Sequence, residues 1–439
     1  MGVSVERREF IRLVGAGLAA FAIGVGGGYV LGRGSAAQPQ AISTPTPAQA
    51  PEARRVRSLW IYVGPVEDIG WTAAHHEGRG YVASKFGWLE ARYIEKVSED
   101  RAKSVIEAEL SREKYDAVFA TSYGFKTAIK ELAPRYPGVK FYHCSGEYEY
   151  FEGVDNVATY FAEFYQLYYL NGVAAGASTE TCRVGYVPAF LIPEVVRHIN
   201  AFALGAVYGA RVAGKCGNGE RLEIYSTSPL EAWFAPDKAR DYATYLVNKY
   251  DVDVIAYTED TTAVLDVAES FHDKGKRVYS FSHYSNMYEY YRRKGRTLRA
   301  HLTGQVVNWG PIYEYLLSKL YSGAFSKEDI WARVGDFTPF KWKLPSERST
   351  AGLPEGAVYL APLNTEVIHP KAVAEIKRLY EDMKELLFEP FTGPIRGYKI
   401  DFKGRPQEEP RLKVGQGSRL GRNDLWYMDW FYEKIISPA

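Results

Sequence analysis

Short apolar runs alternate with amphipathic stretches from residue 58 onward. In the first half of the chain, four apolar runs predict buried strands: Ser58–Gly64, Leu89–Val97, Tyr115–Thr121 and Val139–Ser145. Helical spacing separates some of these runs, at Arg101–Leu110 and Phe125–Tyr136. Strands spaced by helices imply right-handed βαβ crossovers, so we expect a parallel sheet.

The same pattern restarts in the middle of the chain. Further strands are predicted at Arg183–Pro188, Arg221–Ser226, Asp253–Thr258 and Arg277–Ser282. Helices are predicted at Pro193–Gly209, Pro236–Tyr250 and Ala263–Lys274, the first with a proline in its first turn. Two consecutive α/β units therefore predict a two-lobed protein, each lobe a parallel sheet flanked by helices.

Parallel sheets bind ligands just beyond the carboxyl ends of their strands. Applied to the predicted strands, this rule gives seven candidate segments: Gly64–Thr72, Thr121–Phe125, Ser145–Glu147, Pro188–Pro193, Ser226–Pro236, Thr258–Thr262 and Ser282–Met287. They come from both halves of the chain. We therefore expect a ligand in a cleft between the two lobes.

The N-terminus has the pattern of an export signal. Arg7 and Arg8 precede an uncharged, moderately apolar stretch, Leu13–Gly32, which is typical of a twin-arginine signal. An ordinary membrane anchor is the alternative, because the stretch is about long enough to span a bilayer. We assign residues 1–33 to this signal or anchor and residues 34–56, rich in Ala, Pro, Ser and Thr, to a linker. Either assignment predicts an exported protein on the extracytoplasmic face of the membrane; cleavage near Ala36–Ala37 stays open.

Charge and cysteine content narrow the function classes. With 54 basic and 53 acidic residues the chain has no basic footprint for nucleic acid. Its three cysteines have neither CxxC nor metal-ligand spacing. A Cys182–Cys216 disulfide is our prediction for an oxidising compartment, and buried free thiols are the alternative.

Catalytic and cofactor motifs are absent from the sequence. It has no phosphate-binding P-loop, no GxSxG and no HExxH. His75 and His76 have no further ligands at suitable spacing, so we expect neither a metal nor a cofactor. The acidic pairs Glu67-Asp68 and Glu259-Asp260 lack an activated nucleophile. These observations favour a receptor with no catalytic residues. A nucleoside-processing enzyme using Glu67, Asp68 or Asp260, and a membrane-anchored sensor, are the alternatives.

Several stretches resemble the basic membrane protein family of solute receptors for ABC-type importers, which includes purine nucleoside receptors. They are Tyr62–Thr72 (YVGPVEDIGWT), Phe119–Gly124 (FATSYG), Gly185–Ala203, Trp233–Lys238 (WFAPDK), Val307–Pro311 (VNWGP), Pro390–Pro394 (PFTGP) and Leu425–Phe431 (LWYMDWF). The resemblance runs in order from about residue 57 to the C-terminus.

This resemblance implies a type I periplasmic-binding-protein-like fold whose cleft closes on a purine, with an ABC permease as partner. We place lobe 1 at residues 57–180, completed by about 285–345, and lobe 2 at 181–284, completed by about 355–400. Residues 401–439 form a C-terminal extension. We expect the receptor to be monomeric and to bind no nucleic acid.

The family pattern also implies site residues in lobe 1. Asp68 and Trp71 match the first loop, where nucleoside receptors have an acidic and an aromatic residue. Ser122, Tyr123 and Gly124 match the second loop, whose backbone and hydroxyl would meet the ligand. The alternatives are a core tryptophan at Trp71 and an ordinary Ser/Gly turn in the second loop.

In lobe 2, Trp233 and Phe234 stand where the family places a second stacking ring, although they could instead staple a helix. Asp260 could accept a hydrogen bond from the base, or act as an N-cap. Trp309 either lines the site or belongs to the core.

One position departs from the family pattern. Nucleoside-binding members have an acidic residue after the strand that matches Val278–Ser282, and this chain has His283 near that position. Without a carboxylate for the ribose hydroxyls, we expect a free base such as adenine rather than a nucleoside. A histidine hydrogen-bonded between strands is the alternative.

Overall fold

The computed structural model describes residues 54–336 and 356–437. By its contacts the chain divides into Met1–Glu52 and Ala53–Ala439. The predicted leader and nearly all of the predicted linker therefore lie outside the described residues. Within residues 54–336 and 356–437, no helix combines the length and the apolar character needed to cross a membrane.

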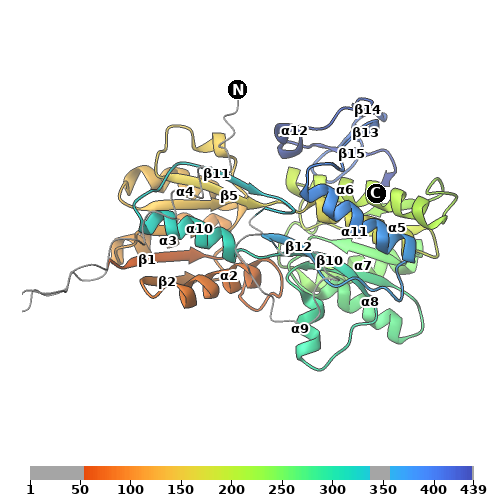
Figure 1. Cartoon of the computed structure of the whole chain (residues 1–439), viewed down its shortest axis with the longest axis horizontal. Coiled ribbons are helices and arrows are strands. Elements are labelled where there is room, and N and C mark those ends of the chain that lie inside the picture. Colours follow the sequence, from red (N-terminus) through yellow and green to blue (C-terminus); the bar gives the residue numbers. More distant parts are fainter. Residues whose placement is uncertain (1–53, 337–355, 438–439) are drawn as a thin grey trace, which may run out of the picture. The chain divides into compact units, whose positions relative to one another are not determined.

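Sheet A has six parallel strands in the order β11-β5-β4-β3-β1-β2. Their bounds are β1 Val56–Ile61, β2 Leu89–Ile94, β3 Ala117–Ala120, β4 Lys140–Cys144, β5 Val157–Ala162 and β11 Asp329–Ala332. Four helices flank it: α2 Trp71–Lys85, α3 Ala102–Arg112, α4 Lys126–Leu132 and α10 Gly310–Tyr321 (Figure 1). Along β1, Trp60 packs in the core under α2 and α10, whereas Leu59 and Ile61 pack in the core under α3 and α4. This alternation buries the strand on both faces, as parallel sheets require.

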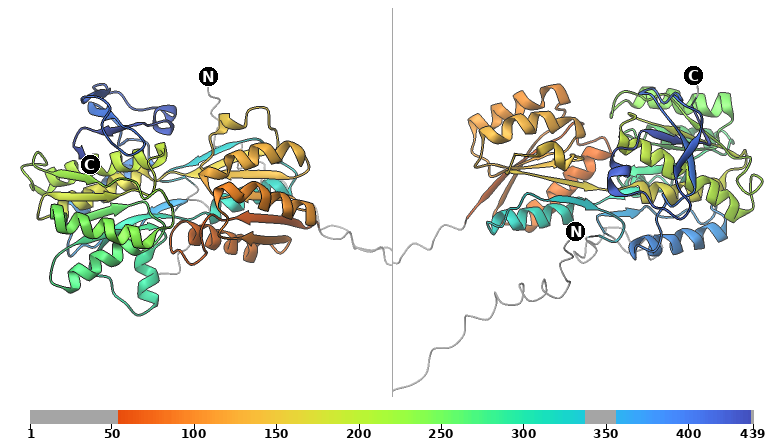
Figure 2. Two further views of the ribbon diagram at one scale, coloured as in Figure 1. Left: turned by 180° about the vertical axis from the view of Figure 1, so that it is seen from behind. Right: turned by 90° about the horizontal axis from the view of Figure 1, so that it is seen from above.

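Sheet B has seven strands in the order β12-β10-β9-β8-β6-β7-β16, all parallel to their neighbours except β12. The strands are β6 Arg183–Val187, β7 Glu223–Ser226, β8 Val254–Tyr257, β9 Tyr279–Tyr284, β10 His301–Val307, β12 Val358–Leu360 and β16 Ile435–Ile436. The helices are α5 Tyr165–Ser178, α6 Pro193–Ala213, α7 Pro236–Tyr250, α8 Ala263–Asp273, α9 Met287–Arg293 and α11 Pro370–Lys384. Helices cover both faces of each sheet, as the two further views show (Figure 2). The predicted two-lobed α/β architecture is confirmed.

We define lobe 1 as sheet A with its four helices and lobe 2 as sheet B with its six. On this definition α5 and β10 belong to lobe 2, although the sequence analysis had placed residues 57–180 and 285–345 with lobe 1. The physical reason is burial: all fourteen residues of α5 are buried. Such a helix must be covered on every side, and α6, α11 and β10 supply that cover.

Glycines allow α5 and α6 to pack with their backbones in close contact. A Cβ atom on Gly172 of α5 would lie 2.1 Å from the carbonyl oxygen of Phe202. One on Gly205 of α6 would lie 2.0 Å from the carbonyl oxygen of Tyr169. A larger residue at either position would push the two helices apart. It would also displace the first crossing between the lobes, where the chain passes from β5 to α5.

The C-terminal residues form a small three-stranded antiparallel sheet in the order β14-β13-β15. Its elements are β13 Ile395–Lys399, β14 Arg411–Val414, α12 Arg422–Trp426 and β15 Trp430–Tyr432. The extension predicted at 401–439 begins earlier, at β13, and from here on the C-terminal extension means the described residues 395–437. It is fixed to lobe 2, because β16 pairs with β7 and because Asn200 of α6 bonds the backbone of Trp430 and Tyr432.

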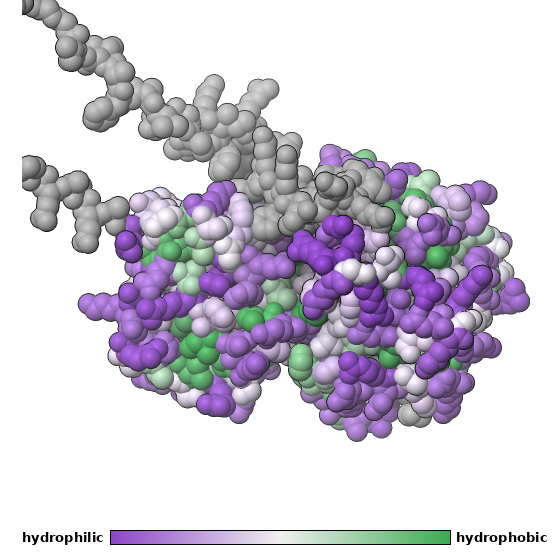
Figure 3. Space-filling model, turned by 90° about the horizontal axis from the view of Figure 1, so that it is seen from below, coloured by the Kyte–Doolittle hydropathy of each residue, from purple (hydrophilic) through white to green (hydrophobic). Residues whose placement is uncertain are grey.

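On the face seen from below, hydrophilic residues predominate and hydrophobic ones form small groups (Figure 3).

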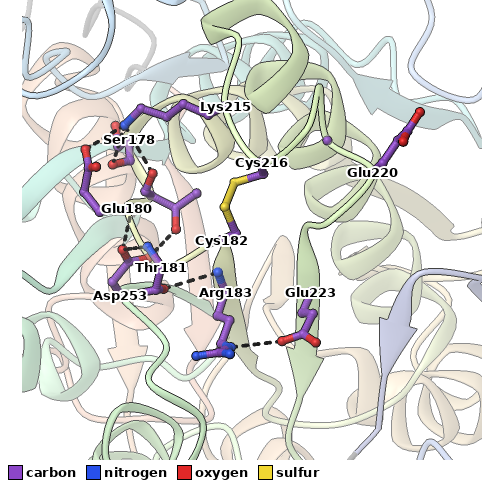
Figure 4. Close-up of a disulfide and its surroundings, with 12 residues drawn as sticks. Ser178, Glu180, Thr181, Cys182, Arg183, Lys215, Cys216, Glu220, Glu223 and Asp253 are labelled. Carbon is purple, nitrogen blue, oxygen red and sulfur yellow. Dashed lines mark hydrogen bonds and ion pairs between the residues drawn. A yellow bond between two sulfur atoms is a disulfide. The ribbon is translucent and has the colours of Figure 1, made fainter.

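The predicted disulfide is confirmed, and it closes a loop around α6. Cys182 and Cys216 are bonded, with their Cα atoms 5.5 Å apart and 34 positions apart in sequence (Figure 4). Cys144 is a buried free thiol. Beside the disulfide, Lys215 pairs with Glu180 at 2.7 Å, and Asp253 accepts hydrogen bonds from the Glu180 and Thr181 backbones.

Replacing both Cys182 and Cys216 by serine should lower the free energy of unfolding by about 2–4 kcal/mol, because a loop of 34 residues regains its entropy in the unfolded chain. Urea unfolding followed by tryptophan fluorescence measures the change. Dithiothreitol should destabilise the wild type to the same extent and leave the double variant unaffected. A wild type insensitive to dithiothreitol would contradict the prediction.

Candidate functional site: a cavity between the lobes

A narrow cavity of about 300 Å³, counting the solvent at its mouth, lies between the carboxyl ends of the two parallel sheets. Both lobes supply its lining: Val63, Trp71, Ser122, Tyr123 and Ser145 from lobe 1, and Glu194, Trp233, Asp260 and Tyr284 from lobe 2. Five of the ten residues predicted from the sequence line it: Trp71, Ser122, Tyr123, Trp233 and Asp260.

Trp71 stands at the start of α2, and 7% of the residue is exposed. Its indole Nε1 donates to the carbonyl oxygen of Thr121 at 2.6 Å. The ring also meets Tyr284 edge-on, with centroids 4.9 Å apart. Both contacts fix the orientation of the indole, so it offers the cavity a rigid aromatic surface.

The loop after β3 brings polar groups to the cavity, most of them already paired. The Ser122 hydroxyl donates to Glu99 Oε1 at 2.7 Å. The Tyr123 hydroxyl donates to Glu147 Oε1 at 3.0 Å and accepts from Lys126 Nζ at 2.8 Å. These bonds hold the loop in one shape before any ligand arrives.

Asp260 follows β8 and is the least satisfied polar group of the cavity. Its side chain is buried, with 3% of the residue exposed, and Oδ1 has no hydrogen-bond partner. The nearest cation-forming atom, His283 Nε2, is 3.8 Å away and is itself unpartnered. Leaving a buried carboxyl oxygen unbonded costs about 1–3 kcal/mol or more. A ligand that bonded this oxygen would recover that cost.

Electrostatics around Asp260 favour its neutral form. Burial raises its pKa well above the ordinary value, and the nearby carboxylates of Asp68, Glu259 and Glu194 raise it further. A protonated carboxyl group can both donate and accept a hydrogen bond. The Asp260 carboxyl group is therefore suited to a ligand edge that has both a hydrogen-bond donor and an acceptor.

Trp233 is the second tryptophan of the cavity lining. It is half-buried and packs on Phe190, with the ring centroids 4.8 Å apart. Its carbonyl oxygen accepts from the backbone N–H of Asp260 at 2.9 Å. This bond ties the ring-bearing loop to the strand end that carries the acid.

Glu194 lines the cavity but was missed by the sequence analysis, which ended the candidate segment at Pro193. It lies in the first turn of α6 and is 8% exposed. Burial raises its pKa to about 7, although Arg197 pulls the other way. An acidic residue in the first turn of a helix that follows a strand end was the signal available. Ser145 and Tyr284 lay within the candidate segments but were not singled out.

Two predicted residues have structural roles beside the cavity. The Asp68 carboxylate accepts from the backbone N–H groups of Gly70, Thr72 and Ala73 at 2.8–2.9 Å, so it caps α2. Burial raises the pKa of Asp68 to about 6, although the hydrogen bonds from these N–H groups lower it. Gly124 donates its N–H to Glu99 Oε1, and a Cβ there would lie 2.0 Å from the Glu99 carboxyl carbon.

Three further predicted residues lie away from the cavity lining. Phe234 is 46% exposed. Trp309 is fully buried and stacks on His75 with centroids 4.2 Å apart, which is the core role named as its alternative. His283 is buried too; its Nδ1 lies 3.0 Å from the Tyr168 hydroxyl and 2.6 Å from Gln305 Nε2. Its Nδ1 is therefore engaged inside lobe 2, and the residue lies outside the cavity lining.

The lobes touch directly beside the cavity. A Cβ atom on Gly70 would lie 2.6 Å from the carbonyl oxygen of Asp260, so only glycine allows this approach. Ser285 of lobe 2 donates to the carbonyl oxygen of Gly70 at 3.0 Å.

Two lining residues at strand ends, Ser145 and Tyr284, have φ angles of 59° and 58°. Such backbone strain concentrates at ligand sites.

A buried ion pair marks the first crossing between the lobes. Glu163 follows β5 and accepts from Arg197 of α6 at 2.8–2.9 Å and from Trp331 Nε1 of β11 at 2.8 Å. Burial raises the pKa of Glu163, but Arg197 and His198 outweigh burial and bring it to about 2. One charged group thus joins both lobes next to the cavity.

The family described as ABC transporter substrate-binding protein, PnrA-like, matches residues 56–334. The chain belongs to this family. It is therefore a solute-binding receptor of the ABC-transporter type, and the predicted membership in the basic membrane protein family is confirmed.

Two curated relatives have names that differ in the ligand. A purine-binding protein of Brucella abortus is 30% identical over 77% of this chain and 83% of its own length. A protein of Haloferax volcanii, named for glucose binding by an ABC transporter, is 30% identical over 66% of this chain and 67% of its own.

Solved structures agree on the fold. An ABC-transporter solute-binding protein from Aeropyrum pernix K1 has a TM-score of 0.60 at 15% identity, covering 76% of this chain and 92% of its own. One from Conexibacter woesei has a TM-score of 0.52 at 17% identity, covering 76% of this chain and 98% of its own. These likenesses confirm the type I periplasmic-binding-protein-like fold.

Glu194→Gln should stabilise the protein increasingly as the pH rises. The unfolded chain loses the Glu194 proton near its ordinary pKa of 4.5, whereas the folded protein keeps it to about pH 7. The wild type therefore loses stability through this window, by an amount on the order of 3 kcal/mol, and glutamine avoids the loss. Urea unfolding at pH 4.5, 6 and 8 measures the difference, which a pH-independent result would contradict.

Glu163→Gln should lower the free energy of unfolding by about 3–5 kcal/mol, because it leaves the buried Arg197 without its charge partner. Glu180→Gln is the matched control: Glu180 is 66% exposed and also pairs with a cation, Lys215. Its loss should cost less than about 1 kcal/mol. Equal effects of the two substitutions in urea unfolding would contradict the assignment.

Proposed function

We propose that this receptor captures a purine, preferably a free base such as adenine, in the interlobe cavity. The observation that carries the proposal is the unpartnered, buried Oδ1 of Asp260 in a cavity lined by Trp71 and Trp233. A flat heteroaromatic ring with polar edges uses both features at once. Stacking on an aromatic side chain contributes about 1–3 kcal/mol per base in nucleic-acid-binding proteins.

Hydrogen-bond complementarity favours adenine among the purines. Its edge carries an amino donor beside a ring-nitrogen acceptor, and a neutral carboxyl group offers an acceptor beside a donor. The raised pKa of Asp260 supports that neutral form. An ionised carboxylate would instead prefer the two adjacent N–H donors of guanine.

A sugar is the second candidate, supported by the name of the Haloferax relative. Carboxyl groups such as Asp260 and Glu194 accept from hydroxyls, and tryptophan rings pack on sugar faces. The relative with a purine in its name covers more of this chain, 77% against 66%, which supports the purine. Calorimetric titration with adenine, adenosine and glucose separates the candidates, and glucose binding without adenine binding would overturn the proposal.

We further propose that the receptor acts as a monomer outside the cytoplasmic membrane and delivers its ligand to an ABC permease. The paired arginines Arg7 and Arg8 before an apolar stretch support export. The Cys182–Cys216 disulfide supports an oxidising compartment. The permease would recognise the receptor whose lobes have closed on the ligand.

Binding without turnover is part of the proposal. The Asp260 and Glu194 carboxyl groups are the acids of the cavity lining, which among the described residues contains no histidine, lysine or cysteine. Hydrolysis or phosphorolysis of adenosine by the purified protein would favour the enzyme alternative.

Trp71→Ala should weaken adenine binding at least tenfold, because it removes a fixed stacking surface of the cavity. Phe234→Ala is the matched control, since this aromatic residue is 46% exposed and lies outside the cavity lining. Its affinity should equal that of the wild type. Calorimetric titration measures both, and equal losses for the two variants would remove Trp71 from the site.

Asp260→Ala should also weaken adenine binding at least tenfold, whereas Asp260→Asn should retain most of the affinity. Asparagine, like a neutral carboxyl group, offers one donor and one acceptor side to the ligand. An asparagine variant as weak as the alanine variant would contradict recognition by the neutral acid. An alanine variant with wild-type affinity would contradict any role for Asp260.

A further inference from the structure

Two buried rings pack against Trp71, the stacking residue of the proposed site. Trp309 meets the Trp71 ring edge-on with the centroids 5.3 Å apart, and His75 meets it edge-on at 4.7 Å. Trp309 and His75 stack on each other, with the centroids 4.2 Å apart and the planes 10° apart. Both are fully buried, and neither lines the cavity. They can therefore affect a bound ligand only through a residue that does line it.

One face of α2 makes these contacts. Trp71, His75 and Gly78 are spaced four and three positions apart, so they lie on the same side of the helix. All three pack against Trp309. A Cβ atom on Gly78 would lie 2.8 Å from the Cβ atom of Trp309, so the helix backbone approaches this residue directly. A shift of Trp309 would therefore disturb the helix face that carries Trp71.

Trp309 is itself held by packing. Tyr160 meets its ring edge-on, with the centroids 5.7 Å apart. Its stacking partner His75 is fixed in turn, because His75 Nδ1 lies 2.6 Å from the hydroxyl of Tyr313 on α10. Burial lowers the pKa of His75 well below its ordinary value, so the stacked ring is neutral. Trp309 Nε1 has no hydrogen-bond partner among the described residues, so the indole acts on its neighbours through ring contacts.

Trp309 also stands at a crossing between the lobes. β10 of sheet B ends just before Asn308, and α10 of lobe 1 begins at Gly310. Asn308 donates its backbone N–H to the carbonyl oxygen of Ala357 at 2.8 Å, and its Oδ1 accepts from the N–H of Gly310 at 3.0 Å. The ring that packs against Trp71 thus belongs to a segment that connects the two lobes.

We infer that Trp309 is a positioning residue: it holds the Trp71 indole in the orientation in which the ligand stacks on it. The inference rests on the proposed function, in which a flat ligand uses Trp71. The hydrogen bond from Trp71 Nε1 to the Thr121 carbonyl oxygen fixes one edge of the indole. A single bond still allows a ring to turn about it, and the edge-on contact with Trp309 opposes that turn.

Trp309→Leu should weaken adenine binding about three- to tenfold, because Trp71 then loses an aromatic contact that orients it. Trp60→Leu is the matched control, since Trp60 is also fully buried and its ring packs on Phe119 and Tyr313. Both substitutions should lower the stability measured by urea unfolding. In calorimetric titration, however, Trp60→Leu should keep the wild-type affinity. Equal affinity losses in the two variants, or no loss in the Trp309 variant, would contradict the inference.

A double-mutant cycle distinguishes positioning from a general effect on the fold. In a protein that already carries Trp71→Ala, Trp309→Leu should change the adenine affinity less than about twofold, because no indole remains to be held. The same loss with and without the Trp71 indole would show that Trp309 acts by another route, and would overturn the inference.

Trp309→Phe serves as the second variant if leucine lowers the yield of folded protein. Its smaller ring should give a smaller loss of affinity, again only where Trp71 is present. A wild type that binds adenine and depends on Trp71 but not on Trp309 would overturn this inference alone. A wild type that binds no adenine would overturn the proposed function, and the inference with it.

Discussion

Glu163 carries its charge at a point with no exposed surface, where the chain first leaves one sheet for the other. A buried carboxylate survives there only because Arg197, His198 and Trp331 surround it with donors. These partners come from both lobes. The cluster therefore links the two lobes where the chain first passes between them.

One side of the cavity is rigid, and the other side has a carboxyl oxygen without a hydrogen-bond partner. Trp71 and the loop at Tyr123 are held by hydrogen bonds within lobe 1, so they present a fixed surface. Asp260 of lobe 2 is buried with an oxygen unbonded, a state that favours closure only when a ligand supplies the missing partner. Because Gly70 and Asp260 touch across the cleft, closure and ligand contact occur at the same place.

Several strands were readable from the sequence as short apolar runs, and several helices by their amphipathic spacing. The spacing failed at α5, which is buried on all sides and so has no amphipathic period, and this failure misplaced the first lobe boundary. The strand-end segments were predictable, and within them the family resemblance singled out Trp71 and Asp260, which line the cavity. The direction of the side chains was not predictable: Phe234 is 46% exposed and His283 is buried outside the cavity lining, because neighbours distant in sequence decide both.

The central claim is that one ligand is held by both lobes at once. Amide hydrogen exchange followed by mass spectrometry, with and without adenine, tests it most directly. The account predicts slower exchange on adenine addition at two segments together, Thr121–Phe125 of lobe 1 and Thr258–Thr262 of lobe 2, with β2 at the far edge of sheet A unchanged. Slower exchange in one lobe alone, or in neither, would contradict capture between the lobes.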